Sequence, residues 1–533
     1  MDTQKSMYGY LKDSIQDKTK DKLIYFNRKI KGNELFSYID SLSFYLTKIG
    51  VKKGEAVGIC LPNIPQAVIS LYAINRIGAV ANVIHPKISA KALFRIVDQT
   101  NTKVIFVFDA MLKYYYKGLR AKGVKIISCS ASHFLKGVRK AFAAFYEPDL
   151  EEDVTDFMTT ISEKGEVDRQ MPPFDTAVYL HSGGTTGEPK IVELSSYAFN
   201  ELVKNVMSRA LKNHKYSDEH TMLMILPLFH GFGLGICIHL ALSKFKMVMM
   251  PRFRAKDAIK LIKKHRINYL AGIPAMYEKI MKEKSFDGKY LSSLMYLFCG
   301  AEKLNPEIKK EFDAILKKND STAEIYEGYG LSEVASVLTF NVKGECKAGT
   351  QGRPIDGAEI KIIDKDGVEC PPNVVGETLV KSKSMMNSYL FSDLSESFYI
   401  DENGEKWLRT GDLGYLDEDG YYVFKDRIKR MIKIAGVNIF PSEIEQAVCK
   451  MKEVDMACVV RTTKNNRPCT KLYLKLNKAF KYSILIENRI KAVIAEEFIK
   501  YAVPCEIIAV KEMPLTLMGK VDYKKYEEME EER

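Results

Sequence analysis

Helical sequence patterns alternate with short apolar runs through the first two-thirds of the chain, and this alternation constrains the fold more than any other feature. Three runs have the length and apolarity of buried strands: GEAVGICLP (54–62), TKVIFVFDA (102–110) and VKIISCS (124–130). AVISLYAINRIGAVANVI (67–84) has the pattern of a helix and the strand that follows it. Such alternation is typical of parallel sheets covered by helices.

The pattern changes after about residue 352, where the apolar segments become shorter and are separated by glycine turns. AEIKIID (358–364), VGETLVKS (375–382) and GYYVFK (420–425) are strand-like, and the residues that follow have the pattern of a compact α+β unit. A chain of 533 residues is too long for one compact core, so we expect at least two domains.

Composition excludes few function classes. The net charge of +12 comes from lysines spread along the whole chain, with no aromatic-studded basic segment and no zinc-ligand spacing, so no nucleic-acid partner is expected. The ten cysteines are scattered from Cys60 to Cys505 without a C-x-x-C pair, and the first residues lack the apolar core of a signal peptide. We therefore expect reduced thiols and a cytoplasmic location.

One uncharged segment, MLMILPLFHGFGLGICIHLAL (222–242), is long enough to span a bilayer. It also contains Pro227, His230, His239 and glycines at 231, 233 and 235, which oppose a membrane span. We interpret it as a buried strand (222–226), a functional turn and a buried helix, and we expect no transmembrane span.

The segment HSGGTTGEPK (181–190) has the composition of a loop. Its glycines allow close backbone approach, and its hydroxyl and amide groups could surround an anion. The Walker A pattern does not fit, because Glu188 and Pro189 separate Gly187 from Lys190, and Ile191 follows. Taken alone, the segment is either a phosphate loop of another kind or a polar turn.

Six further motifs follow this loop in order, and together they closely resemble the signatures of the AMP-forming acyl-CoA synthetases, relatives of nonribosomal-peptide adenylation domains and luciferases. They are LPLFHGFG (226–233), CGAEKL (299–304), YEGYGLSE (326–333), RTGDLG (409–414), KDRIKRMIKIAGVNIFPSEIE (425–445) and PLTLMGKVD (514–522).

The resemblance implies the fold and the domains. The expected fold is α/β, with a large N-terminal domain of helix-covered, mostly parallel sheets and a small β-rich, barrel-like part. A small, mobile α+β C-terminal domain follows. The expected domains are 1–428, which binds ATP and the acid, and 429–533, a lid with a catalytic lysine. The implied cofactors are ATP and Mg²⁺, with coenzyme A as co-substrate.

The resemblance also implies an ATP site. Asp412 accepts the ribose hydroxyls, and Arg427 is a second ribose and phosphate contact. Ser332 contacts the α-phosphate, and Glu333 is the Mg²⁺ ligand, with Thr185 beside the metal. Two departures from the usual loop are Gly183 in place of a hydroxyl residue and Ile191 in place of a glycine. The remaining implied nucleotide contacts are Ser182, Gly184, Thr186, Gly187 and Lys190 at the phosphates, and Gly300, Ala301, Glu302, Glu327, Gly328 and Tyr329 around the adenine.

Catalysis, by the same resemblance, depends on Lys520, Glu333 and His230. Lys520 bridges the acyl carboxylate and the α-phosphate, and it lies in the small domain. The small domain is then expected to rotate about Lys429, which withdraws Lys520 and brings in the loop around Gly436 as part of the thiol channel.

His230 also bears on the substrate, because amino-acid-activating relatives carry an Asp there to pair with the substrate ammonium. We therefore expect a hydrophobic carboxylic acid without an α-amino group. Fatty acids are slightly favoured over aryl acids, because the small residues after His230 indicate an open channel. The implied pocket residues are His230, Phe232, Gly233, Cys237, Cys299 and Gly330.

The acceptor is expected to be coenzyme A, since no carrier-protein domain follows Lys520. A stand-alone ligase that loads a carrier protein is the alternative enzyme. A non-catalytic nucleotide-binding regulatory protein would keep the fold but lose the catalytic lysine and the metal-binding carboxylate. Both Lys520 and Glu333 are present, so a regulatory protein is the least favoured alternative. The sequence gives no indication of the oligomeric state.

Overall fold

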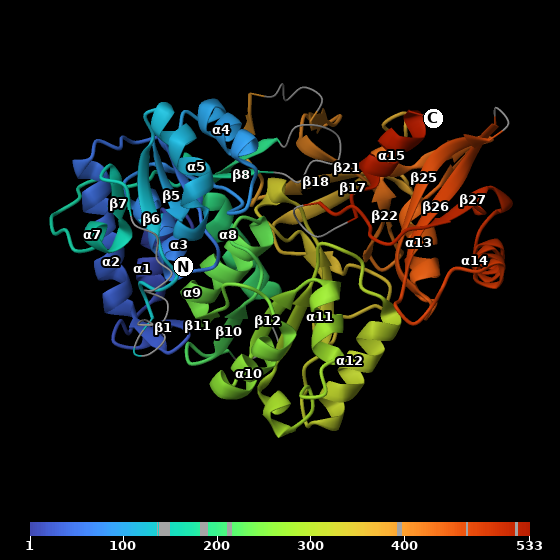
Figure 1. Ribbon diagram of the computed structural model, residues 1–533, viewed down its shortest axis with the longest axis horizontal. Coiled ribbons are helices and arrows are strands. Elements are labelled where there is room, and N and C mark those ends of the chain that lie inside the picture. The colour runs from blue at the N-terminus through green and yellow to red at the C-terminus, as the bar shows by residue number, and fades with distance from the viewer. Residues whose placement is uncertain are drawn as a thin grey trace. The chain divides into compact units, whose positions relative to one another are not determined.

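The computed structural model describes residues 1–135, 137, 150–181, 190–210, 216–391, 397–464, 467–516 and 521–532 (Figure 1). Contacts within the chain group these residues into two compact units. The first unit comprises the described parts of 1–181, 190–359 and 381–391, and the second comprises 360–380 and the described parts of 397–532.

An eight-stranded sheet in the first unit has the order β19-β9-β8-β4-β3-β5-β6-β7. The strands from β8 to β7 along this order pair in parallel, and β9 and β19 add an antiparallel edge. The three predicted buried strands are β3, β5 and β6, so this part of the prediction is confirmed. The bounds are β3 (Ala56–Cys60), β4 (Val80–Val83), β5 (Val104–Phe108), β6 (Lys125–Cys129), β7 (Val154–Asp156), β8 (Thr176–His181), β9 (Ile191–Ser195) and β19 (Ser388–Leu390).

Helices follow most of these strands, as parallel pairing requires. Helix α4 shows the local cause: the side chain of Ser89 accepts the backbone N–H of Ala92 at its start, and Leu93, Ile96 and Val97 bury one face. The helices of this region are α1 (Met7–Ser14), α2 (Gly32–Lys48), α3 (Pro65–Arg76), α4 (Ala90–Gln99), α5 (Asp109–Ala121), α7 (Phe157–Thr160) and α8 (Ser196–Ala210).

A nine-stranded sheet completes the first unit, in the order β16-β15-β14-β13-β12-β10-β11-β1-β2. Its central strands are parallel, and α10 (Ala255–His265), α11 (Pro274–Met281) and α12 (Pro306–Lys318) connect them (Figure 1). The strands are β1 (Asp21–Tyr25), β2 (Arg28–Lys31), β10 (Thr221–Met224), β11 (Lys246–Met249), β12 (Tyr269–Gly272), β13 (Tyr296–Cys299), β14 (Ile325–Tyr329), β15 (Thr339–Phe340) and β16 (Arg353–Pro354).

The uncharged segment 222–242 lies within this sheet region and forms a strand, a turn and a helix, as predicted. Strand β10 ends at Met224, and a π-helix (Phe232–Leu240) continues into α9 (Ala241–Lys244). Among the described residues, no helix is both long and apolar enough to cross a membrane.

The second unit contains a five-stranded sheet in the order β17-β18-β21-β20, with β22 paired to β21. Antiparallel pairing joins β18, β20 and β22 to the central strand β21. This sheet is the predicted β-rich part. The bounds are β17 (Ala358–Ile363), β18 (Gly376–Ser382), β20 (Phe398–Ile400), β21 (Lys406–Leu416) and β22 (Tyr422–Arg427).

The C-terminal residues form the predicted α+β unit around a three-stranded sheet of β25 (Val454–Lys464), β26 (Arg467–Leu476) and β27 (Glu506–Ala509). Two helices, α13 (Pro441–Cys449) and α14 (Ile484–Glu497), share one apolar core with the sheet. A smaller core joins the sheet to α15 (Tyr523–Glu531). A hairpin of β23 (Ile432–Ile434) and β24 (Val437–Ile439) precedes α13.

Candidate functional site

The phosphate-loop prediction falls largely on residues 182–187, which lie outside the described part of the chain. The flanking residues are described. His181 ends β8 opposite Ile191 of β9, and its Nε2 lies 2.7 Å from Oδ1 of Asn82. Burial lowers the pKa of His181 to about 4, so this imidazole is neutral at pH 7.

Lys190 and Glu333, predicted from separate motifs, are joined through Tyr389. The Lys190 Nζ lies 4.4 Å from the centroid of the Tyr389 ring. The Tyr389 hydroxyl donates a hydrogen bond of 2.7 Å to Oε1 of Glu333. The two predicted residues therefore contact the same aromatic side chain.

Backbone contacts hold this cluster in place. Glu333 lies in the 3₁₀ turn Ser332–Val334, and its carbonyl oxygen accepts the N–H of Met386 at 2.7 Å. Tyr389 lies opposite Val192 in the β19–β9 pair, which places it two positions from Lys190 in the neighbouring strand. Tyr389 was not predicted, because nothing in the SMMNSYLF segment indicates pairing with a strand nearly two hundred residues earlier.

The residues predicted around the adenine lie at the ends of β13 and β14. Cys299 is opposite Glu327 in this parallel pair, so Gly300 and Gly328 continue side by side. A Cβ atom on Gly300 would lie 3.4 Å from both the Gly328 carbonyl oxygen and the Phe232 ring. The next residues, Ala301 and Glu302, are exposed, and Ala301 has a positive φ of 70°.

The Glu327 carboxylate is engaged by the protein itself. Its Oε1 accepts the backbone N–H of Leu304 at 3.1 Å and the side-chain amide of Gln351 at 3.0 Å. Burial raises the pKa of Glu327, whose residue is only 8% exposed. These contacts hold the Glu327 side chain at the end of β14. Tyr329 follows in the same strand and is half-buried.

His230 lies in the turn after β10 and is half-buried. Its ring packs edge-on against Phe229, with centroids 4.6 Å apart, and Phe229 in turn contacts His85 at 4.4 Å. The predicted pocket cysteines, Cys237 in the π-helix and Cys299 at the end of β13, are both buried. Burial raises the pKa of each thiol, that of Cys237 to about 12, so neither is a thiolate at pH 7.

The glycines of the predicted acid pocket face packed backbone. A Cβ atom on Gly233 would collide with the carbonyl oxygen of Pro227, and one on Gly330 would collide with that of Ser336. A Cβ atom on Gly231 would lie 2.5 Å from the Ala335 carbonyl oxygen, which is also too close. The small residues after His230 therefore allow close backbone packing, and the open channel remains a prediction.

In the second unit the structure brings Asp412 and Arg427 together. They are opposite each other on β21 and β22, and Arg427 Nε lies 3.3 Å from Asp412 Oδ1. Asp412 is 3% exposed and follows Gly411, whose φ of 69° turns the chain there. The two residues predicted to contact the ribose thus form one ion pair.

The predicted hinge and channel residues are both exposed. Lys429 is the central residue of the 3₁₀ turn Ile428–Arg430. Gly436 and Ala435 have φ values of 81° and 52°, which make the two-residue turn of the β23–β24 hairpin. Lys520, the predicted adenylation lysine, lies outside the described residues.

No cluster of three or more potential metal ligands occurs among the described His, Cys, Asp and Glu side chains. Mg²⁺ is commonly held by one or two carboxylates together with substrate phosphates and water. Glu333 offers a hard oxygen donor of this kind, with its Oε1 already oriented by Tyr389.

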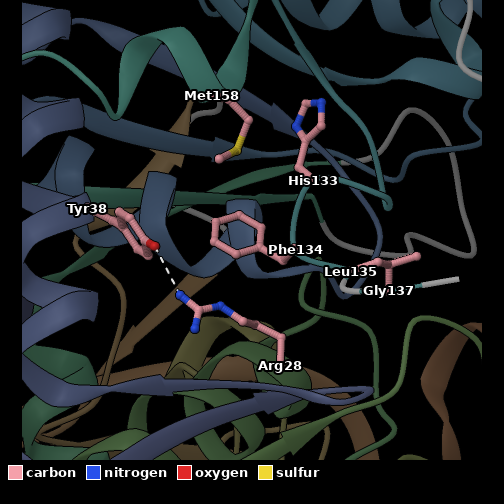
Figure 2. A pocket seen from close by; sticks show the side chains of 7 residues that line it. All are labelled: Arg28, Tyr38, His133, Phe134, Leu135, Gly137 and Met158. Carbon is pink, nitrogen blue, oxygen red and sulfur yellow. Dashed lines mark hydrogen bonds between the residues drawn. The ribbon is translucent and has the colours of Figure 1, made fainter. Parts of the chain in front are cut away.

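A cavity of about 550 Å³ lies elsewhere in the first unit (Figure 2). Figure 2 shows Arg28 donating to the Tyr38 hydroxyl, at 3.2 Å, below the ring of Phe134. None of the residues predicted from the motifs lines this cavity. The lining residues are Arg28, Tyr38, His133, Phe134, Leu135, Gly137 and Met158.

Known proteins share both the motifs and the fold. A family model described as AMP-binding enzyme matches residues 13–390, and one described as AMP-binding enzyme C-terminal domain matches residues 443–520. The long-chain-fatty-acid–CoA ligase of Bacillus subtilis (strain 168) is 27% identical in an alignment that covers 97% of this chain and 93% of that protein. The 4-coumarate-CoA ligase 1 of Narcissus pseudonarcissus is 26% identical over 490 residues, 89% of this chain and 84% of that protein.

Solved structures agree at the level of the fold. The crystal structure of the anthranilate CoA ligase AuaEII in complex with anthranoyl-AMP superposes with a TM-score of 0.86 at 21% identity, covering 100% of this chain and 98% of that chain. The shared fold consists of two helix-covered sheets, an antiparallel sheet and a C-terminal α+β unit. Because the AMP-binding model spans well over half of the residues, this chain belongs to the AMP-forming acyl-CoA synthetases, the AMP-binding enzyme family. Enzymes of this family are acid–thiol ligases that use ATP, Mg²⁺ and coenzyme A.

Proposed function

We propose that this chain activates a hydrophobic carboxylic acid without an α-amino group and transfers the acyl group to coenzyme A. An acid oxygen attacks the α-phosphorus of ATP, the bond to the β-phosphate oxygen breaks, and pyrophosphate leaves. The thiol sulfur then attacks the acyl carbon, the thiol proton is lost, and AMP leaves. The observation that supports this proposal is the contact series Lys190–Tyr389–Glu333, in which two residues of separate motifs contact the same side chain.

The first step brings two anions together, so it requires cations and aligned donors where charge accumulates. Lys190, with the loop residues Ser182 to Gly187, is proposed to hold the β- and γ-phosphates. Glu333 is proposed to hold Mg²⁺, which neutralises phosphate charge when bound, and Ser332 to contact the α-phosphate. Lys520 is proposed to bridge the acyl carboxylate and the α-phosphate.

The nucleoside is proposed to lie against two other groups of residues. The ends of β13 and β14 would contact the adenine through backbone, since the Glu327 carboxylate already has protein partners. Asp412, which is paired with Arg427, would accept the ribose hydroxyls.

The chain is proposed to act as two domains, 1–428 and 429–533, in a cytoplasmic setting. The two family matches leave residues 391–442 between them, which accommodates a boundary at Lys429. Rotation about Lys429 would remove Lys520 after adenylation and bring in the hairpin turn at Gly436. This exposed turn is a suitable backbone surface for a thiol channel.

The substrate class is proposed from His230 and its surroundings. An imidazole packed on Phe229 supplies no fixed negative charge for a substrate ammonium. An unpaired ammonium buried there would cost several kcal/mol. Fatty acids remain the first choice because the Bacillus relative named for them aligns with 97% of this chain, and aryl acids are second.

The test is ATP–pyrophosphate exchange with octanoate, palmitate, benzoate, 4-coumarate, acetate and leucine. We expect octanoate or palmitate to have the highest kcat/KM. A maximum with leucine or acetate would contradict the pocket interpretation while leaving the enzyme class intact. Thioester formation from the best acid is then compared with coenzyme A and with a carrier protein as acceptor. Preference for the carrier protein would replace the proposed acceptor, and absence of exchange with every acid would favour a regulatory nucleotide-binding role.

A further inference from the structure

We propose that Tyr389 is a positioning residue for the proposed metal-binding carboxylate, Glu333, and for the phosphate-loop lysine, Lys190. The inference rests on the proposed function of Glu333 and Lys190, and it assigns a role to a residue that no motif named. Three contacts carry it: the hydroxyl to Glu333, the ring beneath Lys190, and the strand pairing that fixes the Tyr389 backbone.

The hydroxyl acts on Glu333. By donating a hydrogen bond of 2.7 Å to Oε1, it occupies one oxygen and fixes the rotation of the carboxylate. The Met386 N–H donates to the backbone carbonyl of Glu333, so both the backbone and the side chain of Glu333 are held. A carboxylate oriented in this way binds a cation with less loss of side-chain entropy, which is how outer partners tune a metal ligand.

The ring acts on Lys190. The Nζ lies 4.4 Å from the ring centroid, within the range of a cation–π contact. Lys190 is exposed, and the ring restricts the rotamers that its long side chain samples. Tyr389 itself is 9% exposed and is held in β19 against β9, so it is the rigid member of the three.

The two functions of Tyr389 are separable by substitution. Tyr389→Phe removes the hydroxyl and keeps the ring, so it tests the contact with Glu333 alone. Tyr389→Leu removes both. Tyr116→Phe is the matched control, because the Tyr116 hydroxyl donates to the Asp153 carboxylate at 2.8 Å on an exposed surface away from the motifs.

The measurement is Mg²⁺ binding to the protein–ATP complex by calorimetry without any acid, followed by pyrophosphate exchange as a function of Mg²⁺. We expect Tyr389→Phe to raise the half-saturating Mg²⁺ concentration about tenfold and Tyr116→Phe to leave it unchanged. Tyr389→Leu should in addition raise the KM for ATP. The calorimetric arm remains informative even if the wild type exchanges with none of the acids, so failure of the proposed function is distinguished from failure of this inference.

A double-mutant cycle tests whether Tyr389 acts through Glu333. In a Glu333→Gln background, Tyr389→Phe should have less than half of its effect on Mg²⁺ dependence, on a logarithmic scale, because the orienting contact no longer serves a carboxylate. Additive effects, or a loss of thermal stability with unchanged Mg²⁺ dependence, would show a purely structural role and overturn the inference.

A separate observation concerns two cysteines in the second unit. Cys469 lies in β26 and Cys505 directly precedes β27, and their Sγ atoms are 2.6 Å apart. The Cys505 N–H donates to the Thr470 carbonyl at 2.9 Å, so the parallel strands hold the two residues side by side. Both are free thiols and partly exposed.

We infer that Cys469 and Cys505 are a modification site that forms a disulfide in the presence of a small-molecule disulfide such as oxidised glutathione. One cysteine thiolate attacks the small disulfide, forms a mixed disulfide and releases one thiol. The other cysteine thiolate then attacks the protein sulfur, forms the Cys469–Cys505 bond and releases the second thiol. Two electrons pass from the cysteines to the small molecule, and the two protons lost by the cysteines end on the released thiols.

The test treats the full chain with oxidised glutathione and maps linked peptides by mass spectrometry. We expect a loss of two hydrogens, a Cys469–Cys505 link, and a higher urea midpoint because the bond closes a loop that contains α14. Cys469→Ser should retain a glutathione adduct at Cys505 without the link, whereas Cys449→Ser should keep the link. No link in the wild type, or a link to the exposed Cys346 or Cys449, would overturn the inference.

Discussion

The carboxylate of Asp426, at the end of β22, accepts the backbone N–H of Ser442 at the start of α13, with a distance of 2.9 Å. Helix α13 begins after Phe440, which has no side-chain acceptor for the unpaired N–H groups of the first turn. Asp426 therefore supplies from another element the cap that the local sequence lacks. Its contact with Ser442 crosses the predicted domain boundary at Lys429.

Asp426→Ala is expected to lower the free energy of unfolding of the second unit by about 1–2 kcal/mol, as loss of a helix cap does. The measurement is urea denaturation followed by circular dichroism. Asp366→Ala, which removes an exposed acid of the same unit, is the control and should have little effect. Equal midpoints for the two variants would show that the cap contributes nothing.

Lys429→Pro is expected to leave adenylation nearly intact and to slow thioester formation strongly. Proline fixes φ near −65°, so it obstructs a rotation located at that residue. Lys429 is the exposed central residue of the 3₁₀ turn Ile428–Arg430, where the proposed boundary falls. Lys429→Ala is the control that keeps the backbone free. Normal overall turnover of the proline variant would place the hinge elsewhere.

Lys520→Ala is expected to reduce acyl-adenylate formation by at least about a hundredfold, because a cation that stabilises the transition state is removed. Conversion of a supplied acyl-adenylate to the thioester should be spared. The two half-reactions are measured separately by pyrophosphate exchange and by thioester release. An equal loss in both would contradict the two-conformation mechanism.

Glu333→Gln is expected to weaken Mg²⁺-dependent adenylation, with partial recovery at high Mg²⁺, because the amide is a poorer ligand for a hard cation. Exchange rates over a range of Mg²⁺ concentrations provide the measurement. Glu302→Gln, which changes an exposed acid near the predicted adenine slot, is the comparison and should keep the wild-type Mg²⁺ requirement. An unaltered Mg²⁺ requirement in Glu333→Gln would contradict the assignment of Glu333 as the Mg²⁺ ligand.

Acidification should destabilise the first unit through His239. This residue is fully buried in the π-helix between the Tyr72 hydroxyl and the Asn200 side chain, and burial lowers its pKa to about 3. The unfolded state therefore takes up the proton first. The contribution of His239 to the free energy of unfolding is fully present above pH 6.5 and is lost as the pH falls from 6.5 towards 3.

The expected loss is about 1.4 kcal/mol of unfolding free energy per pH unit for this one group over that window. Urea denaturation between pH 7 and pH 5 measures the slope for the wild type and for His239→Gln, which keeps polar contacts but does not titrate. The variant should have the shallower slope. Parallel slopes would show that His239 is not the responsible group.

The order of secondary structure was predictable because it depends on local patterning. The apolar runs at 54–62, 102–110 and 124–130 became β3, β5 and β6, and the uncharged segment 222–242 became a strand, a turn and a helix. The family was predictable for a related reason. Seven motifs in a fixed order preserve the residue types that the chemistry requires, whatever the spacing between them.

Only the tertiary structure decided which of these residues meet and what surrounds them. The partnership of Tyr389 with Glu333 and Lys190 depends on β19 pairing with β9, and no local pattern encodes a strand pair so distant in the chain. The packing of the glycines after His230 was likewise decided by the tertiary structure. A glycine is small whether it faces an open channel or a carbonyl oxygen, and only packing shows that Gly233 faces Pro227.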